Sequence, residues 1–178
     1  MKKTFYFSVV SLLVLCVLSL RYFSGLKTLE KGDRLLLPVK VEEIKTDAFS
    51  SSARIRYYNF IPVDALMKES GTVVVRYSDN TRIEFVSKEK DRKLRPREFL
   101  LKYTIVPPPL LKKENAEPNI RFAASGIRFS KDKKISYLSI CYAVVYVTAS
   151  GETFLSGLAD CNGTELVKSL IYPENRTL

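Results

Sequence analysis

An uncharged run of sixteen residues at positions 5–20, directly behind a basic Met-Lys-Lys-Thr start, constrains this chain more than any other feature. As a helix, sixteen residues span roughly 24 Å, slightly less than the roughly 30 Å hydrocarbon core of a bilayer. Arg21 can snorkel toward water, and the two aromatic residues after it suit the interface, which lengthens the effective span. The sequence therefore predicts a membrane anchor over residues 1–23 that contacts the bilayer through residues 5–23.

The anchor is expected to stay uncleaved. A signal peptide needs small residues at its cleavage site, and residues 17–19 (Val-Leu-Ser) fit this need poorly. A lipoprotein needs a small residue before its cysteine, but Leu15 precedes Cys16. The Lys-Lys pair favours a cytoplasmic N-terminus under the positive-inside rule. We therefore expect a stalk at 24–31 and an extracytoplasmic domain, periplasmic in a bacterium, at 32–178.

The composition excludes several classes of protein. Apolar residues make up 46% of the 178, which is enough for a core and excludes intrinsic disorder as the main state. The chain has no histidine, so Ser-His-Asp triads, Cys-His dyads and zinc sites with histidine ligands are excluded. Three scattered cysteines cannot complete a thiolate zinc site, and no glycine-rich phosphate loop occurs. We expect no metal and no cofactor, and a role that is more non-enzymatic than enzymatic.

Beyond the stalk, the residue patterns are those of strands. Pro38 lies in the first pattern and predicts an edge strand or a bulge there. Asp79-Asn80 predicts a two-residue hairpin turn that sets Val75 opposite Glu84. The strand patterns cover residues 35–41, 54–60, 72–78, 81–86, 135–148 and 152–158.

One short helix is predicted near the C-terminus, at residues 163–171. The fold class is therefore mainly β: a single N-terminal transmembrane helix, then a β-sandwich or barrel-like domain with that short helix.

Cys141 and Cys161 flank the second predicted hairpin, the one that turns near Gly151. Opposed strand residues are close enough to form a disulfide if both side chains lie on the same face. An oxidising compartment would permit that bond. The alternative is that the register or the face differs by one residue and both are buried thiols.

A basic segment at residues 88–102 carries seven of the cations behind the net charge of +10, against three carboxylates. One interpretation is a surface for anionic lipid or an acidic protein partner. The alternative is a solvated loop between strands, because the acids are interspersed. Nucleic acid is not expected as a partner, since an extracytoplasmic domain rarely meets it. The candidate contact residues are Lys88, Lys90, Arg92, Lys93, Arg95 and Arg97.

Three stretches resemble the GDYXXLXP family of bacterial membrane-anchored proteins. They are the Gly-led apolar stretch 32–37, the turn and strand at 46–57, and the closing hairpin 143–158 followed by Asn-Gly. Residues 50–52 (Ser-Ser-Ser) stand where the family has Gly-Asp-Tyr. The resemblance implies an outward-facing β domain that works beside a multi-pass membrane protein.

Residues 24–33 show a weaker local similarity to type I signal peptidases, in which a serine nucleophile follows the anchor. The similarity implies Ser24 as the nucleophile. Because the chain lacks histidine, its base must be a lysine with a lowered pKa. The nearest counterpart of that family's Lys-Arg strand is residues 54–56 (Arg-Ile-Arg), and arginine keeps its proton.

The leading hypothesis is a single-pass membrane protein whose extracytoplasmic β domain is a non-enzymatic interaction or accessory module for a membrane-protein partner. The alternatives are a Ser-Lys membrane peptidase that uses Ser24, and an anionic-surface binder that uses residues 88–102.

Overall fold

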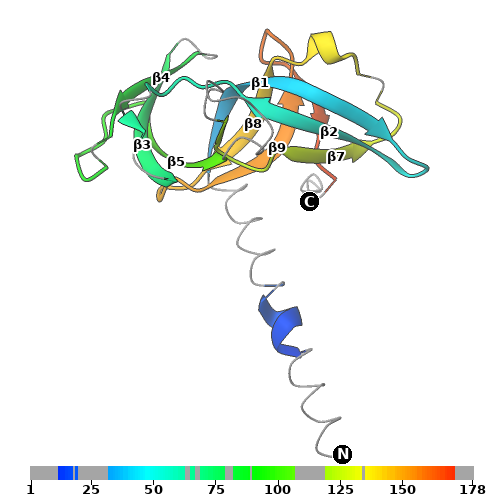
Figure 1. Ribbon diagram of the computed structural model, residues 1–178, viewed down its shortest axis with the longest axis horizontal. Helices are drawn as coiled ribbons and strands as arrows, with labels where there is room; N and C mark the ends of the chain where they lie inside the picture. Colours follow the sequence, from blue (N-terminus) through cyan, green and yellow to red (C-terminus); the bar gives the residue numbers. More distant parts are fainter. Residues whose placement is uncertain are drawn as a thin grey trace, which may run out of the picture.

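The computed structural model describes residues 12–17, 19, 32–62, 65–66, 69–78, 82–88, 90–106, 119–133 and 135–170. These residues form a mainly β structure with two antiparallel sheets, which confirms the predicted class (Figure 1). One sheet has the strand order β10-β9-β8-β1-β2-β7, and the other has the order β4-β3-β5-β6. The elements are β1 Asp33–Thr46, β2 Ser50–Tyr57, β3 Ser70–Ser78, β4 Arg82–Ser87, β5 Glu98–Val106, β6 Asn119–Arg121, β7 Gly126–Ser130, the 3-10 turn η2 Tyr137–Ser139, β8 Tyr142–Val147, β9 Thr153–Ala159 and β10 Glu165–Lys168.

The long strand β1 lies inside the larger sheet and changes partner halfway. Its first half pairs with β8 and its second half with β2. Pro38 lies at the change: its carbonyl accepts a hydrogen bond from the Tyr58 N–H at 3.0 Å, at the end of the β2 ladder. The missing proline N–H therefore falls where pairing with β2 ends. The prediction of an edge strand was wrong, and the bulge in β1 lies at Val41 and Glu43 instead.

The six-stranded sheet curves into a half-barrel. The Leu170 N–H, just after β10, donates to the Arg128 carbonyl of β7 at 2.8 Å. β10 and β7 stand at opposite ends of the strand order, so this bond joins the two outer strands. Such a closure protects sheet edges that would otherwise be free.

One apolar core runs through both sheets. Leu35 of β1, Val75 of β3, Leu101 of β5 and Val145 of β8 all belong to it and are fully buried. Leu36 points away from that core, yet it is 1% exposed because it packs with Val144, Ala159 and Tyr77 in a second cluster. The run Leu-Leu-Leu at 35–37 is therefore apolar on both faces because both faces are covered.

The predicted C-terminal helix at 163–171 was wrong over its described part. Glu165–Lys168 form β10, which pairs with β9. The Asp160 side chain accepts hydrogen bonds from the N–H groups of Asn162 at 2.9 Å and Thr164 at 2.8 Å, and this closes a tight turn. A turn that ends at Thr164 brings the next residues directly to the edge of β9. Pairing there satisfies more backbone groups than one isolated helical turn would.

The first hairpin was predicted one residue out of register. Val75 pairs with Phe85 rather than Glu84, and Ser78 pairs with Arg82. Three residues, not two, therefore connect β3 and β4. Register in a hairpin follows loop length, so one extra loop residue shifts every pair.

The predicted anchor is described at residues 12–17 and 19, and these residues are helical. Across the described parts of the chain, no helix is long and apolar enough to cross a bilayer. The stalk at 24–31 lies outside the described residues.

Candidate binding surfaces

Glu98, the first residue of β5, organises the basic segment. Its side chain is fully buried, and its carboxylate accepts hydrogen bonds from the Arg76 guanidinium at 3.0 Å and the Arg92 guanidinium at 2.7 Å. The backbone N–H of Arg95 donates to the same carboxylate at 2.8 Å. A buried charge is tolerated when it is paired and hydrogen-bonded in this way.

These contacts keep Glu98 ionised. The hydrogen bond from the Arg95 amide contributes most, and the Arg76 and Arg92 guanidinium groups add to it. Together they outweigh burial and lower the pKa of Glu98 to about 2. The carboxylate therefore stays negative at neutral pH and holds the connection 88–97 against β3 and β5.

The predicted basic surface is divided by this arrangement. Arg92 is turned inward, with its side chain 24% exposed. Arg97 adopts a left-handed φ of 64°, and its carbonyl accepts a hydrogen bond from the Tyr77 N–H at 3.0 Å. The connection is therefore an ordered part of the fold. The basic residues of 88–97 that remain exposed are Lys88, Lys90, Lys93, Arg95 and Arg97.

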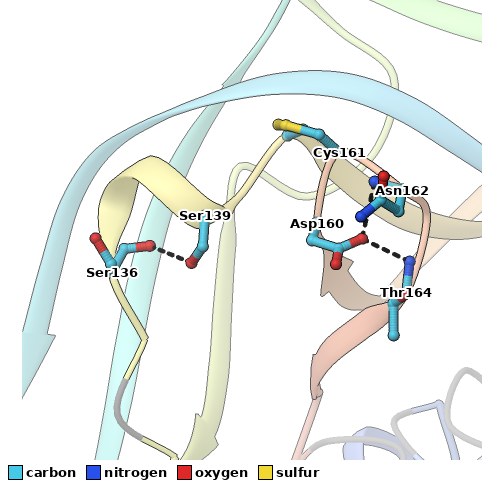
Figure 2. The surroundings of a disulfide bond; sticks show 7 residues. Ser136, Ser139, Asp160, Cys161, Asn162 and Thr164 are labelled. Carbon is cyan, nitrogen blue, oxygen red and sulfur yellow. Dashed lines mark hydrogen bonds between the residues drawn. A yellow bond between two sulfur atoms is a disulfide. The ribbon is translucent and has the colours of Figure 1, made fainter.

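The structure joins Cys141 and Cys161 in a disulfide, with 4.9 Å between their Cα atoms (Figure 2). The bond lies just beyond the paired ends of β8 and β9, where the Cys141 N–H donates to the Ala159 carbonyl at 3.0 Å. It ties the segment that carries Ser136 and Ser139 to the turn that begins at Asp160 (Figure 2). The alternative of two unpaired thiols does not describe this arrangement.

Of the residues implied by the peptidase similarity, the structure describes residues 54–56. Ser24 lies outside the described residues. Arg56 forms an ion pair with Glu42, and Arg54 lies 4.0 Å from Glu43. Both arginine side chains are more than half exposed, so they belong to surface ion pairs of the kind that contribute little to stability.

Two further observations come from the structure. Within the described residues, no three histidine, cysteine or carboxylate side chains are grouped so that they could hold a metal ion.

A cleft of about 560 Å³ opens at the end of the half-barrel, between β1, β2, β7 and the connection that follows β7. The sequence patterns did not predict this cleft, because β7 itself was not predicted.

Comparison of the chain with protein-family models, with curated proteins and with solved structures finds no match.

Proposed function

We propose that this protein is a single-pass membrane protein whose extracytoplasmic β domain is a non-enzymatic interaction module for a membrane-protein partner. The anchor is residues 5–23, and tethering raises the local concentration of the domain near its partner. The resemblance to the GDYXXLXP family supports the same reading of the chain.

The helical residues 12–17 carry the membrane part of the proposal. Five consecutive or near-consecutive apolar side chains point around the whole helix, and each is between 50% and 65% exposed. A helix that is apolar on every side and exposed to this extent is stable in lipid rather than in water. Ser19 donates its hydroxyl hydrogen to the Leu15 carbonyl at 2.8 Å, which satisfies a polar group inside the helix as a bilayer requires. The five side chains are Leu12, Leu13, Val14, Leu15 and Val17.

The disulfide is the observation that supports placing the domain on the extracytoplasmic side of the membrane. Structural disulfides persist in oxidising compartments and are rare in the cytoplasm of mesophiles. A bond between Cys141 and Cys161 therefore supports an extracytoplasmic domain.

Thiol labelling of intact cells tests on which side of the membrane the β domain lies. In a Cys16→Ser background, Cys141 and Cys161 are the remaining cysteines of the chain. We expect an impermeant maleimide to label them in intact cells after treatment with an impermeant reductant and not before. Labelling that appears only after lysis, with an outer control protein labelled normally, would place the domain in the cytoplasm and overturn the proposal.

Carbonate extraction tests the anchor separately. Leu13→Arg with Leu15→Arg places two charges in the middle of the apolar run, each of which costs about 2.5–3.5 kcal/mol at a helix centre. We expect the native chain to stay in the membrane pellet and the double variant to move to the supernatant. Release of the native chain would contradict the anchor.

A second candidate function rests on the connection 88–97, which exposes five basic side chains. It would bind anionic lipid and would do so less as salt rises. Flotation with phosphatidylglycerol vesicles tests it, with Lys90→Glu and Lys93→Glu as the charge reversal.

The peptidase alternative is tested by Ser24→Ala, which would abolish any cleavage activity of the purified chain if Ser24 is the nucleophile.

A further inference from the structure

The cleft at the end of the half-barrel, here named the mouth cleft, opens from the inner face of the sheet. Pairing sets Thr46 opposite Ser51, and Ser51 opposite Phe129, so these side chains share one face of neighbouring strands. Phe129 is 1% exposed and belongs to the apolar core. The core therefore closes the inner end of the cleft.

Of the described residues after β7, four line this opening: Lys131, Lys133, Ile135 and Ser136. The connection leaves β7 at Ser130 and reaches η2, where the Tyr137 hydroxyl accepts a hydrogen bond from the Ile44 N–H at 3.2 Å. Since β2 lies between β7 and β1, the connection crosses from one side of β2 to the other. In Figure 1 the β1–β2 hairpin, β7 and the yellow turn η2 lie at the same end of the domain.

The mouth cleft is apolar below and basic at its rim. Ile44 and Ile135 supply partly exposed apolar surface, the buried Phe129 closes the bottom, and Lys131 and Lys133 are exposed at the rim. The volume of about 560 Å³ falls within the roughly 300–1,000 Å³ of small-molecule sites, which often occupy the mouths of β-barrels.

The two lysines have no carboxylate partner among the described residues. Lys131 donates to the Ala48 carbonyl at 3.4 Å, and within the part of the chain that the structure describes no ion pair involves either ammonium group. Among the described residues, neither of the carboxylates nearest in sequence forms an ion pair with these lysines. Asp132 accepts the Ser130 hydroxyl at 3.1 Å, and Asp47 accepts the backbone N–H of Ser50.

Two exposed apolar side chains lie in the turns that follow the lining residues Thr46 and Ser136. Phe49, in the β1–β2 turn beside Ala48, is 91% exposed, and Leu138, next to Tyr137 in η2, is 93% exposed. These are the two most exposed large apolar side chains of the described β domain. Apolar side chains grouped around an apolar cleft mark a binding site more often than scattered ones do.

We propose that the mouth cleft binds a small carboxylate that carries an apolar body. The carboxylate lies between Lys131 and Lys133, where ammonium donors form charge-assisted hydrogen bonds with it. The apolar body lies on Ile44 and Ile135. This assignment stands on the described residues alone and does not depend on whether residues 5–23 cross a membrane.

The cleft lies beside the C-terminal end of β1. Fourteen strand residues cover roughly 45 Å, so the cleft lies far along the strand from Asp33. A free amphiphilic acid and the C-terminus of a polypeptide share the chemistry that this site would recognise.

Equilibrium dialysis of radiolabelled octanoate tests the proposal. The full-length chain is held in phosphatidylcholine nanodiscs, and empty nanodiscs give the amount of octanoate that dissolves in lipid. We expect saturable binding of one octanoate per chain above that blank, and no such binding of octylammonium, which has the same body and the opposite charge. N-acetyl-leucyl-leucine, compared with its C-terminal amide, tells whether a peptide terminus is also accepted.

Two variants and one matched control decide the result. Lys131→Glu with Lys133→Glu should weaken octanoate binding by at least about tenfold. Lys40→Glu with Arg121→Glu changes the net charge equally at other exposed positions and should leave binding unchanged. Thr46→Phe keeps both lysines and fills the cleft, so it should also abolish binding. No saturable binding, equal binding of octylammonium, or full binding by the Lys131/Lys133 variant would overturn the proposal.

Discussion

Two basic connections of this domain, residues 88–97 between β4 and β5 and residues 131–136 between β7 and η2, use their charges differently. The first folds around the buried carboxylate of Glu98, which binds two guanidinium groups and one backbone amide. The described residues of the second include no such centre, and Lys131 and Lys133 line a partly apolar cleft. In this domain, cations that face a buried strand carboxylate hold the fold together. Cations without such a partner remain available to bind a ligand.

Removing the centre of the first connection should have the largest effect. Glu98→Ala leaves the Arg76 and Arg92 guanidinium groups and the Arg95 amide without their acceptor, and lost partners of a buried charge are costly. We expect a clear fall in melting temperature and cleavage by trypsin within 88–97 that is faster by about tenfold or more. Circular dichroism and timed proteolysis measure both.

Glu152→Ala is the matched control for that experiment. Glu152 also pairs with a cation, Lys102, at 2.9 Å, but both side chains are about half exposed. Exposed pairs contribute about 0–1 kcal/mol, so little change is expected. Equal effects of the two variants would show that burial of Glu98 has no special importance.

Removing the disulfide, which lies near the second connection, should have the next largest effect on stability. Cys141 and Cys161 are separated by 20 positions, and closing a loop of that size stabilises a fold by about 3 kcal/mol. Cys141→Ser with Cys161→Ser should lower the free energy of unfolding by that amount in urea titrations. Hydrogen exchange should rise in η2 and the residue 160–164 turn more than in 88–97, because the bond ties the former two together. Uniform loss of protection would contradict a local role.

Protonation of Glu98 in acid should weaken the first connection, with a smaller effect on stability than loss of the disulfide. The folded pKa of Glu98 is about 2, below its ordinary value of 4.5. A depressed pKa means that its contribution is complete above about pH 4.5 and is lost as pH falls toward 2. Asp47, in the β1–β2 turn, also has a lowered pKa because the Ser50 and Phe49 amides donate to it. Melting temperatures from pH 6 to pH 2 should therefore fall less steeply for Glu98→Gln than for the native chain, and parallel curves would contradict the assignment.

The sequence predicted the parts of this fold that depend on local pattern. The strand patterns at 35–41, 72–78, 81–86 and 152–158 fall within or across strands of the structure. It failed where distant pairing decides. β7 alternates apolar and polar residues over only five positions, too short a stretch to have been predicted as a strand, and it pairs with β2. β10 was predicted as part of a helix, because its four residues fit the helical period as well as the strand period. Pairing with the edge of β9 makes it a strand.

The candidate sites divide in the same way. The cation pattern at 88–102 was visible, but the role of Glu98 was not, because burial of a carboxylate depends on strands β3 and β5 meeting. The mouth cleft was not predicted at all. Its lining comes from three strands and one connection, and no single stretch of sequence carries its signal.

Charge reversal at the second connection should have the smallest effect on stability and the largest contrast with the first. Lys131 and Lys133 are exposed and have no ion pair in the described chain, so Lys131→Glu with Lys133→Glu should change the free energy of unfolding by less than about 0.5 kcal/mol. Urea titration measures this value beside that of Arg92→Glu, which places a second negative charge against Glu98 and should destabilise the fold. If the Lys131/Lys133 variant were the less stable of the two, the lysines would be structural cations like Arg92. The distinction between an internally neutralised connection and an open one would then fail.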